Sequence, residues 1–360
     1  MDIFEIKNIV QKLMSKYRLH KYYNRLKRTT TINKLTESQK QEIRDYYLKN
    51  FGVKVSTKWH EVLYSISGVY RYDYMPFEVY NHLIESFSPF AFKKVLDDKS
   101  LYDWLLPDVQ LPKRIYSSCN NVIYSYTEGK RWMSLNDLLD NISEIDNCII
   151  KPSKDSSAGI GVRALKVSQG VVSDYDGSLE ELIKSYKGNF VIEEKVVCCN
   201  NLNDLNPSSC NTLRIHTWRN RQENIIEFVS AFLRVGRNGS LVDNSFAGGI
   251  AVPIGNDGIL SNSGCTFKNY QRYEKSDTGI TFKGYKIQQF DEMVDIACKA
   301  HHNLPYFDFI GWDITVNSDN QVVVIEFNPD PDMRLDQLAF LDSCLLSKQE
   351  KIYKVLYKHD

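Results

Sequence analysis

The chain has 360 residues, in which 45 Lys and Arg balance 45 Asp and Glu, and 42% of the residues are hydrophobic. This composition is typical of a globular protein with a large core that is divided into about two or three lobes. The zero net charge argues against a general nucleic-acid-binding protein, because neutralising phosphates needs a clear excess of Lys and Arg. It still permits a local basic site for a small phosphorylated ligand.

The eight cysteines contain no C-x-x-C pair, and none combines with the seven histidines at zinc-ligand spacing. A chain of this length needs no disulfide framework, so we expect reduced cysteines and a cytoplasmic protein. The charged N-terminus lacks the apolar region of a signal peptide, and no apolar run approaches the ~20 residues of a membrane span. The adjacent Cys198 and Cys199 permit a redox interpretation, but small apolar packing residues are the favoured interpretation.

The first 30 residues predict an amphipathic helix with a strongly basic polar face. Its residues 1–28 permit peripheral contact with the anionic inner face of a membrane, although a packed helix with a solvated basic face is favoured. Thr36 and Gln39 then predict a capping box at the start of a helix that continues to about Lys49. Residues 50–110 are rich in aromatic residues and mostly helical in pattern.

From about residue 147 the pattern changes to short β-type runs separated by turn residues. Ser178 and Glu181 predict a capped short helix, and a longer helix is expected over about 288–303. The expected strands cover residues 148–151, 162–167, 189–197, 212–219, 225–236, 308–317 and 321–328. The fold class is therefore α+β, with a helical front and a sheet-rich back.

The sharpest motif lies in the last predicted hairpin, residues 311–328. Depending on where its turn is centred, Asp313 lies opposite Glu326 or one residue from it, and Asn328 shares the face of Glu326. Two carboxylates and an amide oxygen are hard ligands that suit Mg²⁺. Like charges opposed in a sheet are costly unless a cation lies between them. The alternative is that one carboxylate points to solvent.

Two further segments suit a nucleotide. Residues 151–162 place Lys151 and a loop of small residues between two strands, where backbone N–H groups can surround phosphates. This is no P-loop, because no G-K-[ST] follows and the next element is a strand. The strand over 190–197 ends in charged residues, where a carboxylate and backbone groups suit an adenine. Each signal alone is weak, because Gly/Ser loops and capped strand ends are common.

Taken in order, these segments resemble the ATP-grasp proteins, and more specifically the sugar-transfer-associated ATP-grasp group found with bacterial surface-polysaccharide genes. The resemblance runs from about Asp98 to Asp332, which is most of the chain. The segments that carry it are 98–106, 111–112, 150–152, 157–162, 206–217, 232–236, 243–249, 311–313 and 325–329.

The resemblance implies an ATP-grasp fold, in which the nucleotide lies between two antiparallel β-sheet lobes. The implied organisation is a helical N-terminal region (1–97), an N-terminal lobe (98–197), a C-terminal lobe (198–345) and a C-terminal tail (346–360). The implied ATP-binding residues are Lys99 and Lys151 at the phosphates, Ser156, Ser157, Gly159 and Gly161 in the covering loop, and Glu194, Lys195 and Val196 at the adenine. The implied metal ligands are Asp313, Glu326 and Asn328, usually for two Mg²⁺ ions, with Mn²⁺ as a substitute.

ATP-grasp ligases activate a carboxylate as an acyl phosphate that an amine then captures, and the protein acts mainly by positioning and charge neutralisation. We expect Arg214 and Arg234 to be the catalytic cations, the alternative being arginines paired with sheet carboxylates. For His216, a contact with the substrate and a role in packing are equally good interpretations. D-alanine ligases of this fold have an arginine where this chain has Gly311, which adds weight to Arg214 and Arg234. Asp204 is the nearest candidate for the ribose hydroxyls.

The resemblance implies an ATP- and Mg²⁺-dependent carboxylate–amine ligase that joins an amino acid, or another small carboxylate or amine, to a sugar of a surface polysaccharide. The expected partners are ATP, the two small substrates and a nucleotide-linked or lipid-linked sugar, with no nucleic acid. One alternative is a tubulin-tyrosine-ligase-like enzyme that modifies peptides or proteins, since such enzymes share the Gly-Φ-Asp-Ile strand. The other is a non-catalytic nucleotide-binding scaffold in a glycan assembly complex, against which the intact Lys151, Asp313, Glu326 and Asn328 argue.

Overall fold

The computed structural model describes residues 17, 19–21, 23–24, 26–28, 31–154, 159–341, 345 and 348–357. Most of the amphipathic helix expected over the first 30 residues lies outside these ranges, so its membrane contact stays a prediction. Ser156 and Ser157 of the expected phosphate loop also lie outside the described residues. Within the described ranges, no helix is both long enough and apolar enough to cross a membrane.

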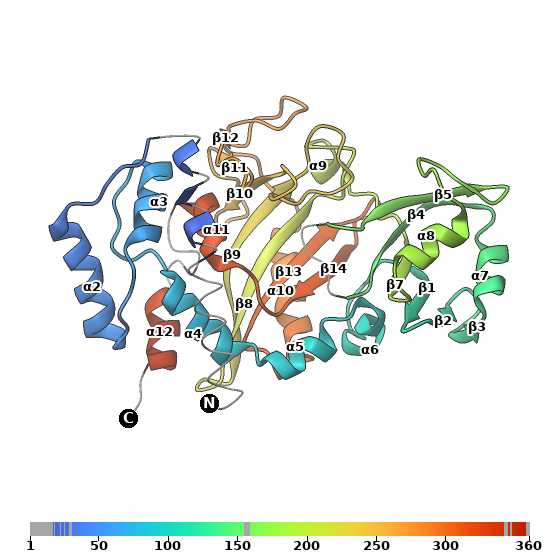
Figure 1. Cartoon of the computed structure of the whole chain (residues 1–360), viewed down its shortest axis with the longest axis horizontal. Helices are drawn as coiled ribbons and strands as arrows, with labels where there is room; N and C mark the ends of the chain where they lie inside the picture. Colours follow the sequence, from blue (N-terminus) through green and yellow to red (C-terminus); the bar gives the residue numbers. More distant parts are fainter. Residues whose placement is uncertain are drawn as a thin grey trace.

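The protein has two seven-stranded antiparallel sheets, one at the right end of the molecule in Figure 1 and the other near its middle. The first sheet has the order β3-β2-β1-β7-β4-β5-β6, and the second has the order β12-β11-β10-β9-β8-β13-β14. The strands of the first sheet are β1 (Arg114–Cys119), β2 (Val122–Ser125), β3 (Arg131–Met133), β4 (Ile145–Pro152), β5 (Arg163–Ser168), β6 (Val171–Val172) and β7 (Phe190–Glu194). Those of the second are β8 (Thr212–Asn220), β9 (Ile225–Val235), β10 (Ile250–Ile254), β11 (Gly264–Cys265), β12 (Arg272–Tyr273), β13 (Phe309–Val316) and β14 (Val322–Asn328).

Helices flank both sheets, so the expected α+β class with two antiparallel sheets is confirmed. The α-helices are α2 (Glu37–Phe51), α3 (Lys58–Ser67), α4 (Phe77–Phe87), α5 (Phe90–Leu96), α6 (Tyr102–Leu105), α7 (Leu135–Asn141), α8 (Leu179–Ser185), α9 (Asn200–Asn203), α10 (Phe290–His302), α11 (Met333–Phe340) and α12 (Gln349–Tyr357), and Lys99–Leu101 forms a 3-10 turn, η1. The red helices α11 and α12 lie among the blue helices of the N-terminal region in Figure 1. Ile352 and Tyr353 of α12 share a core with Ile43 and Tyr47 of α2.

Local signals in the sequence predicted several element boundaries. The Thr36 hydroxyl accepts from the backbone N–H of Gln39, and the Gln39 side chain accepts from the N–H of Thr36, which completes the expected capping box. A second capping box joins Ser178 and Glu181 at the start of α8. The expectation that β-structure begins near residue 147 is wrong, because β1, β2 and β3 precede it. Ser117, Ser118 and Ser125 are buried in these strands, so their alternation is not visible as a hydrophobic pattern.

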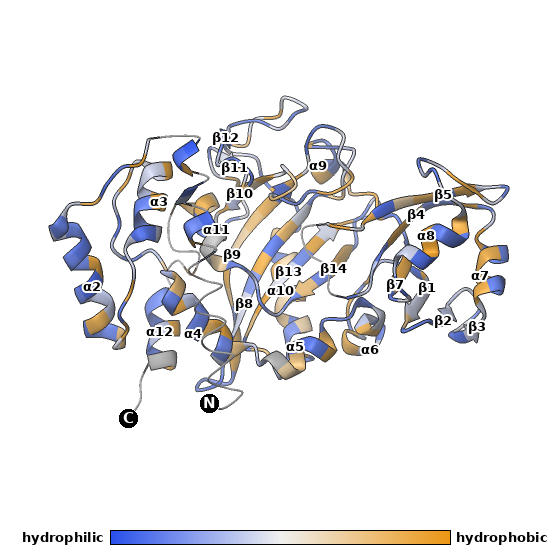
Figure 2. Cartoon of the chain, viewed as in Figure 1, coloured by the Kyte–Doolittle hydropathy of each residue, from blue (hydrophilic) through white to orange (hydrophobic). Residues whose placement is uncertain are grey.

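The second sheet carries the site because its two faces differ. Ile215, Leu233 and Ile314 point to one face and pack with α10 in the largest core. On the other face, alternation along β8 brings Thr212 and Arg214 to one end and Trp218 to the other. Trp218 packs with the helical region, which covers that end. Figure 2 shows the resulting mixture of orange and blue residues along these strands.

A β-bulge sets the register of the last hairpin at the expected metal ligands. Ile314 pairs with Val324, whereas Asp313 pairs with Glu326, so Ile325 is the extra residue of β14. Strict alternation from the core residue Val324 would direct Glu326 into the core. The bulge directs it to the face of Asp313 instead. The two carboxylates therefore lie directly opposite each other. The bulge brings this about and not the position of the turn, because the register of Val316 with Val322 would by itself place Asp313 opposite Ile325.

A buried histidine joins α10 to the second sheet. His301 donates from Nε2 to the Phe307 carbonyl at 2.9 Å, and its Nδ1 accepts from the Thr217 hydroxyl at 2.7 Å. The Thr217 oxygen accepts in turn from the Trp312 indole at 2.8 Å. Both ring nitrogens of neutral His301 are thereby satisfied. Burial lowers the pKa of His301 from 6.5 to about 3.

We expect His301 to weaken the fold as the pH falls. Its folded pKa lies below its unfolded value, so its contribution is complete above pH 6.5 and is lost as the pH falls towards 3. Urea unfolding at pH 7 and 4.5 should show a loss of roughly 2–3 kcal/mol from this group. His301→Gln should remove that part of the pH dependence, whereas His302→Gln, at an exposed neighbour, should keep it. Equal pH profiles for the two variants would refute the assignment.

Candidate nucleotide and metal site

A cavity of about 660 Å³ lies between the two sheets. Strands β4 and β7 line it from the first sheet, and β8, β9, β13 and β14 line it from the second. The connection after β7, the loop residues 241–244 and 246, and the residues 330–332 after β14 also line it. Further lining residues are Tyr80, Lys99, Pro112, Gly159, Val162 and Cys210. The polar end of the second sheet therefore faces this space.

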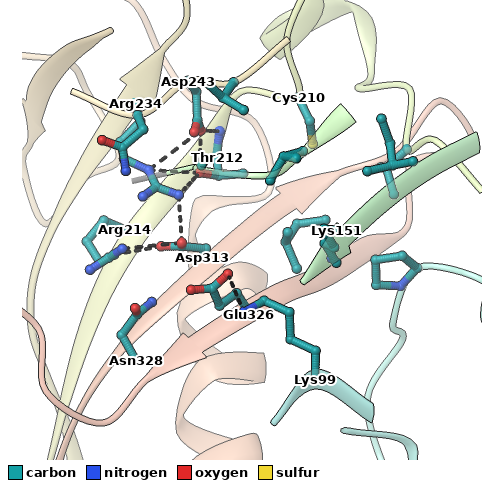
Figure 3. A pocket seen from close by; sticks show the side chains of 18 of the residues that line it. Lys99, Lys151, Cys210, Thr212, Arg214, Arg234, Asp243, Asp313, Glu326 and Asn328 are labelled. Atoms are coloured by element: carbon teal, nitrogen blue, oxygen red, sulfur yellow. Dashed lines mark hydrogen bonds and ion pairs between the residues drawn. The ribbon is translucent and has the colours of Figure 1, made fainter. Parts of the chain in front are cut away.

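Three charged side chains form a row across the floor of the cavity. Arg214, Asp313 and Glu326 pair in register on β8, β13 and β14. Arg214 donates from Nε to Asp313 Oδ1 at 2.6 Å and from Nη2 to Oδ2 at 3.2 Å (Figure 3). This two-point contact fixes the plane of the carboxylate and leaves Glu326 on its other side.

Arg234 contacts the same carboxylate from β9. Its Nη2 lies 2.7 Å from Asp313 Oδ2, and Nε and Nη2 both donate to the Thr212 hydroxyl oxygen, at 3.1 and 2.8 Å. Asp243 Oδ2 accepts from the Thr212 backbone N–H at 2.9 Å and lies 3.6 Å from Arg234 Nε. Asp243 and Thr212 thus hold the guanidinium over Asp313.

The electrostatics of this cluster keep its central groups charged. Burial raises the pKa of Asp313, but Arg214 and Arg234 outweigh burial and the pKa is lowered. Burial lowers the pKa of Arg234, but Asp243 and Asp313 outweigh it and the pKa is raised. For Asp243, burial prevails over Arg234 and raises the pKa of the carboxyl. The two expected catalytic arginines therefore line the cavity and are also paired with sheet carboxylates.

Two lysines reach the cavity from the side of the first sheet. Lys99 Nζ lies 3.4 Å from Glu326 Oε2, and the Lys99 backbone N–H donates to the Ser153 carbonyl, at the end of β4, at 2.8 Å. Lys151 Nζ lies 2.7 Å from Glu193 Oε2. Burial lowers the pKa of Lys99, but Glu326 and Asp97 outweigh it and raise the pKa, so Lys99 stays protonated.

Glu193 is a buried partner that the sequence analysis missed. Its second oxygen lies 3.3 Å from Arg114 Nη2, so Lys151 and Arg114 share one carboxylate. Burial raises the pKa of Glu193, but these two cations outweigh burial and lower it. A role was expected only for the neighbouring Glu194. Glu193 holds Lys151 in place at the cavity wall.

Apolar side chains also line the cavity on the side of the first sheet. They are Ile149, Val162 and Val196, and Glu194 and Lys195 border the cavity beside Val196. The Glu194 carboxylate is half-exposed and lies 2.6 Å from Lys113 Nζ, while the Lys195 N–H donates to the Asn147 carbonyl at 2.8 Å. An apolar slot with a carboxylate and peptide groups at one edge suits a planar heterocycle.

The two expected loop glycines differ in position. Gly159 lines the cavity with φ +73°, and a Cβ there would lie 3.0 Å from Val242 Cγ1. Gly161 has φ +80°, and a Cβ there would lie 2.8 Å from Pro152 Cγ, but Gly161 does not border the cavity. Gly161 therefore shapes the loop, whereas Gly159 reaches the cavity.

His216 and Asp204 do not border the cavity. His216 is fully buried, with Nδ1 at 3.0 Å from Ser230 Oγ and Nε2 at 3.2 Å from Asp336 Oδ2, so it packs between β8 and α11. Asp204 is exposed directly after α9, and its carbonyl accepts from the Thr278 hydroxyl.

Most of the expected site residues lie together. The cavity is bordered by Lys99, Lys151, Gly159, Glu194, Lys195, Val196, Arg214, Arg234, Asp313, Glu326 and Asn328. The sequence analysis missed further polar residues at its wall, namely Glu193, Thr212, Asp243, Asn244, Asp330 and Asp332. For Asp243 a signal existed, because it opens one of the segments that carry the family resemblance.

The oxygen donors at the floor suit a divalent cation that arrives with a ligand. Asp313 and Glu326 are opposed in register, and Asn328 directs its Nδ2 towards the Gly311 carbonyl at 3.5 Å. In the described part of the chain, no three or more His, Cys, Asp or Glu side chains are grouped to hold a metal. Two carboxylates and an amide fit Mg²⁺, which proteins commonly bind through one or two carboxylates plus substrate phosphates.

The chain was compared with solved structures. The ATP-grasp ligase PsnB, complexed with its minimal precursor, is 15% identical over 75% of this chain and 62% of its own, with a TM-score of 0.38. The biotin carboxylase domain of the Hydrogenobacter thermophilus 2-oxoglutarate carboxylase, complexed with MgADP, ADP and bicarbonate, is 10% identical over 74% and 46%, with a TM-score of 0.42. The Staphylococcus aureus N5-carboxyaminoimidazole synthetase, complexed with ADP, is 14% identical over 70% and 52%, with a TM-score of 0.37. The chain thus spans less than two thirds of the length of each.

A comparison with curated proteins gave no match. The profile of the sugar-transfer associated ATP-grasp family matches residues 79–354, which is well over half of the chain. The matched segment contains every residue that borders the cavity. The chain therefore belongs to the sugar-transfer associated ATP-grasp family.

Proposed function

We propose that the protein is an ATP- and Mg²⁺-dependent ligase that activates a carboxylate as an acyl phosphate and couples it to an amine. The observation that carries this proposal is the row of Arg214, Asp313 and Glu326 on the cavity floor, with Lys99 facing Glu326 at 3.4 Å. Such alternating charges suit phosphoryl transfer, in which the protein acts mainly through positioning and electrostatics.

The nucleotide would lie along the cavity between the two sheets. Lys99 and Lys151 would bind its phosphates, the loop around Gly159 would cover them, and Glu194 with the Lys195–Val196 backbone would read the adenine. Glu193 would keep Lys151 in place through their 2.7 Å ion pair. The apolar side chains that line the cavity on the side of the first sheet support a planar ring, and the lysines support an anionic chain.

Asp313, Glu326 and Asn328 would hold magnesium, and we propose two ions, for which Mn²⁺ can substitute. When bound, Mg²⁺ neutralises phosphate oxygens and so favours attack on the γ-phosphorus. The donor set is short of a full coordination sphere, and oxygens of the nucleotide would complete it. The same residues therefore link metal binding to nucleotide binding.

Arg214 and Arg234 would stabilise negative charge during the reaction. A substrate carboxylate oxygen attacks the γ-phosphorus and releases ADP, and the amine then attacks the acyl carbon and releases phosphate. Both steps build up negative charge on oxygen, which fixed cations at the cavity floor can stabilise without reorganising. Asp243 and Thr212 preorganise Arg234, and the two-point contact with Asp313 preorganises Arg214.

Gly311 explains how the arginine comes from a neighbouring strand. A Cβ at Gly311 would lie 3.2 Å from Arg214 Cδ and 2.9 Å from Pro331 Cβ. The absent side chain therefore leaves the space through which Arg214 passes from β8 to Asp313. This supports the view that Arg214 takes the place of the arginine that D-alanine ligases have at this position.

The finer assignment concerns the substrates and the location of the protein. We propose that an amino acid, or another small carboxylate or amine, is joined to a nucleotide-linked or lipid-linked sugar during surface polysaccharide synthesis, and the family's sugar-transfer association supports this. Seven cysteines of the described residues are free, which supports a cytoplasmic location.

A screen for substrate-dependent ADP release tests the proposed reaction. Amino acids and nucleotide sugars, added in pairs, should raise ADP and phosphate release, and mass spectrometry should find a product equal to both substrates less one water. Asp313→Asn should abolish the stimulated release. If no pair stimulates ADP release, the ligase proposal fails.

The proposed metal ligands can be tested separately by comparing the binding of MgADP and of ADP alone. Asp313→Asn removes one negative charge from a buried cluster and should affect the two affinities differently. Affinity for MgADP should fall roughly tenfold or more, whereas affinity for ADP without Mg²⁺ should stay equal or rise, because Arg214 and Arg234 lose their carboxylate. Calorimetry with and without Mg²⁺ measures both. Asp319→Asn, at the exposed turn of the same hairpin, serves as the matched control. Equal losses with and without Mg²⁺ would contradict the metal role.

Gly311→Ala should displace Arg214 from Asp313. The added methyl group should lower the free energy of unfolding by about 1–3 kcal/mol and weaken MgADP binding several-fold. In an Arg214→Ala background the effect on MgADP binding should disappear, although the contact with Pro331 still lowers stability. Additive effects on MgADP binding in this double-mutant cycle would show that Gly311 does not act through Arg214.

A further inference from the structure

Two cysteines outside the proposed mechanism face each other beside the cavity. The Sγ atoms of Cys198 and Cys210 lie 3.8 Å apart. Cys210 borders the cavity and is labelled in Figure 3, whereas Cys198 is buried. The adjacent pair in the sequence was Cys198 and Cys199, but the structure pairs Cys198 with a residue twelve positions further along.

Hydrogen bonds hold Cys198 beside Cys210. The Cys198 thiol donates to Cys210 Sγ at 3.8 Å and to the Asn211 carbonyl at 3.7 Å, and its sulfur lies 3.3 Å from Thr315 Oγ1. The contact between the two thiols lowers the pKa of Cys198 despite burial, whereas the pKa of Cys210 is raised. The thiolate is the reactive form of cysteine, and a reagent in the cavity reaches the pair at Cys210, which borders it.

Other described cysteines lack this combination. Burial raises the pKa of Cys148, Cys265 and Cys298 to about 11, so their thiolates are scarce near neutral pH. None of these three borders the cavity. Cys298 lies on α10 and is only partly buried, which makes it a suitable comparison for thiol access alone.

We propose that Cys198 and Cys210 form a reversible oxidation site that a small peroxide converts to a disulfide. The thiolate of one cysteine attacks one peroxide oxygen, the O–O bond breaks, and water leaves once the released oxygen takes up a proton. The thiol of the other cysteine then attacks the resulting sulfenic sulfur, the S–O bond breaks, and a second water leaves. Two thiols and one hydrogen peroxide thus give one disulfide and two waters.

The position of the pair couples it to the cavity. Forming the disulfide requires the two sulfurs to approach by about 1.8 Å, which draws the Cys210 side chain from the cavity wall towards Cys198. Cys198 follows Val196 by two residues, and Cys210 precedes Thr212, the anchor of Arg234, by two. Bound nucleotide covers Cys210 and shields the pair, and the disulfide weakens nucleotide binding. This coupling rests on the proposed function, whereas the oxidation itself does not.

Limited oxidation of the full chain tests the inference. The reduced protein is treated with hydrogen peroxide, remaining thiols are alkylated, and peptides are identified by mass spectrometry. We expect a Cys198–Cys210 cross-link that dithiothreitol reverses, that forms unchanged in Cys298→Ser, and that is absent from Cys198→Ser. Saturating MgADP should slow its formation about fivefold or more, and the oxidised protein should bind MgADP several-fold more weakly.

The outcomes separate the two proposals. Absence of the cross-link, or oxidation of Cys298 at the same rate as the pair, overturns the oxidation site. A cross-link whose formation MgADP does not slow, in a protein that binds MgADP, overturns the coupling to the cavity. If reduced protein binds no MgADP, the proposed function fails, and the cross-link alone then decides the oxidation site. Cys198→Ser should keep the MgADP affinity of the reduced protein within about twofold.

Discussion

The arrangement of the site depends on one buried carboxylate, that of Asp313. A buried carboxylate without partners would be strongly destabilising, and here Arg214 grips it at two points while Arg234 reaches it from the next strand but one. Arg234 needs its own support, which Thr212 and Asp243 provide. Each charge at the floor is therefore fixed by another, and the whole cluster is built into one face of an antiparallel sheet. A polar face of this kind is stable only because the same strands bury apolar side chains against α10 on their other face.

Two features of the backbone direct the charged side chains of this cluster towards the cavity. The bulge at Ile325 directs Glu326 towards the cavity although its neighbour Val324 points into the core. Gly311 leaves the space that Arg214 crosses. Neither detail adds a functional group, but both decide where existing groups point. The arrangement of charged groups on the cavity floor thus depends on the extra residue Ile325 and on the missing side chain of Gly311.

Contacts between residues that are close in the sequence could be predicted better than contacts between residues that are far apart. Asp313, Glu326 and Asn328 were expected close together because they lie in one hairpin, but the bulge at Ile325, which sets their register, was not visible in the sequence pattern. Strands β1 to β3 were missed because buried serines, such as Ser118 bonded to the Gly188 carbonyl, replace the hydrophobic alternation. Glu193 was missed because the cations that it holds, Arg114 and Lys151, are distant in the sequence. Asp243 is close to Arg234 in the sequence, but it lies in the loop after β9, where no regular alternation indicates which side chains meet. His216 shares the face of Arg214, but α11 covers that part of the sheet through Asp336, which no local pattern indicates.

The balance of charges at the floor restricts what the cavity can bind. Lys99 faces Glu326, Lys151 faces Glu193, and Arg214 with Arg234 faces Asp313 with Asp243. Among the described residues at the rest of the wall, only Lys195 accompanies the carboxylates of Glu194, Asp330 and Asp332, so carboxylates outnumber cations around the cavity. A triphosphate alone would add several negative charges to this partly buried space, which is unfavourable. A triphosphate with divalent cations brings its own compensation, and the proposed metal ligands Asp313 and Glu326 lie where such cations would be needed. The chain as a whole is neutral, but the excess of carboxylates at its cavity favours a metal–nucleotide complex over the nucleotide alone.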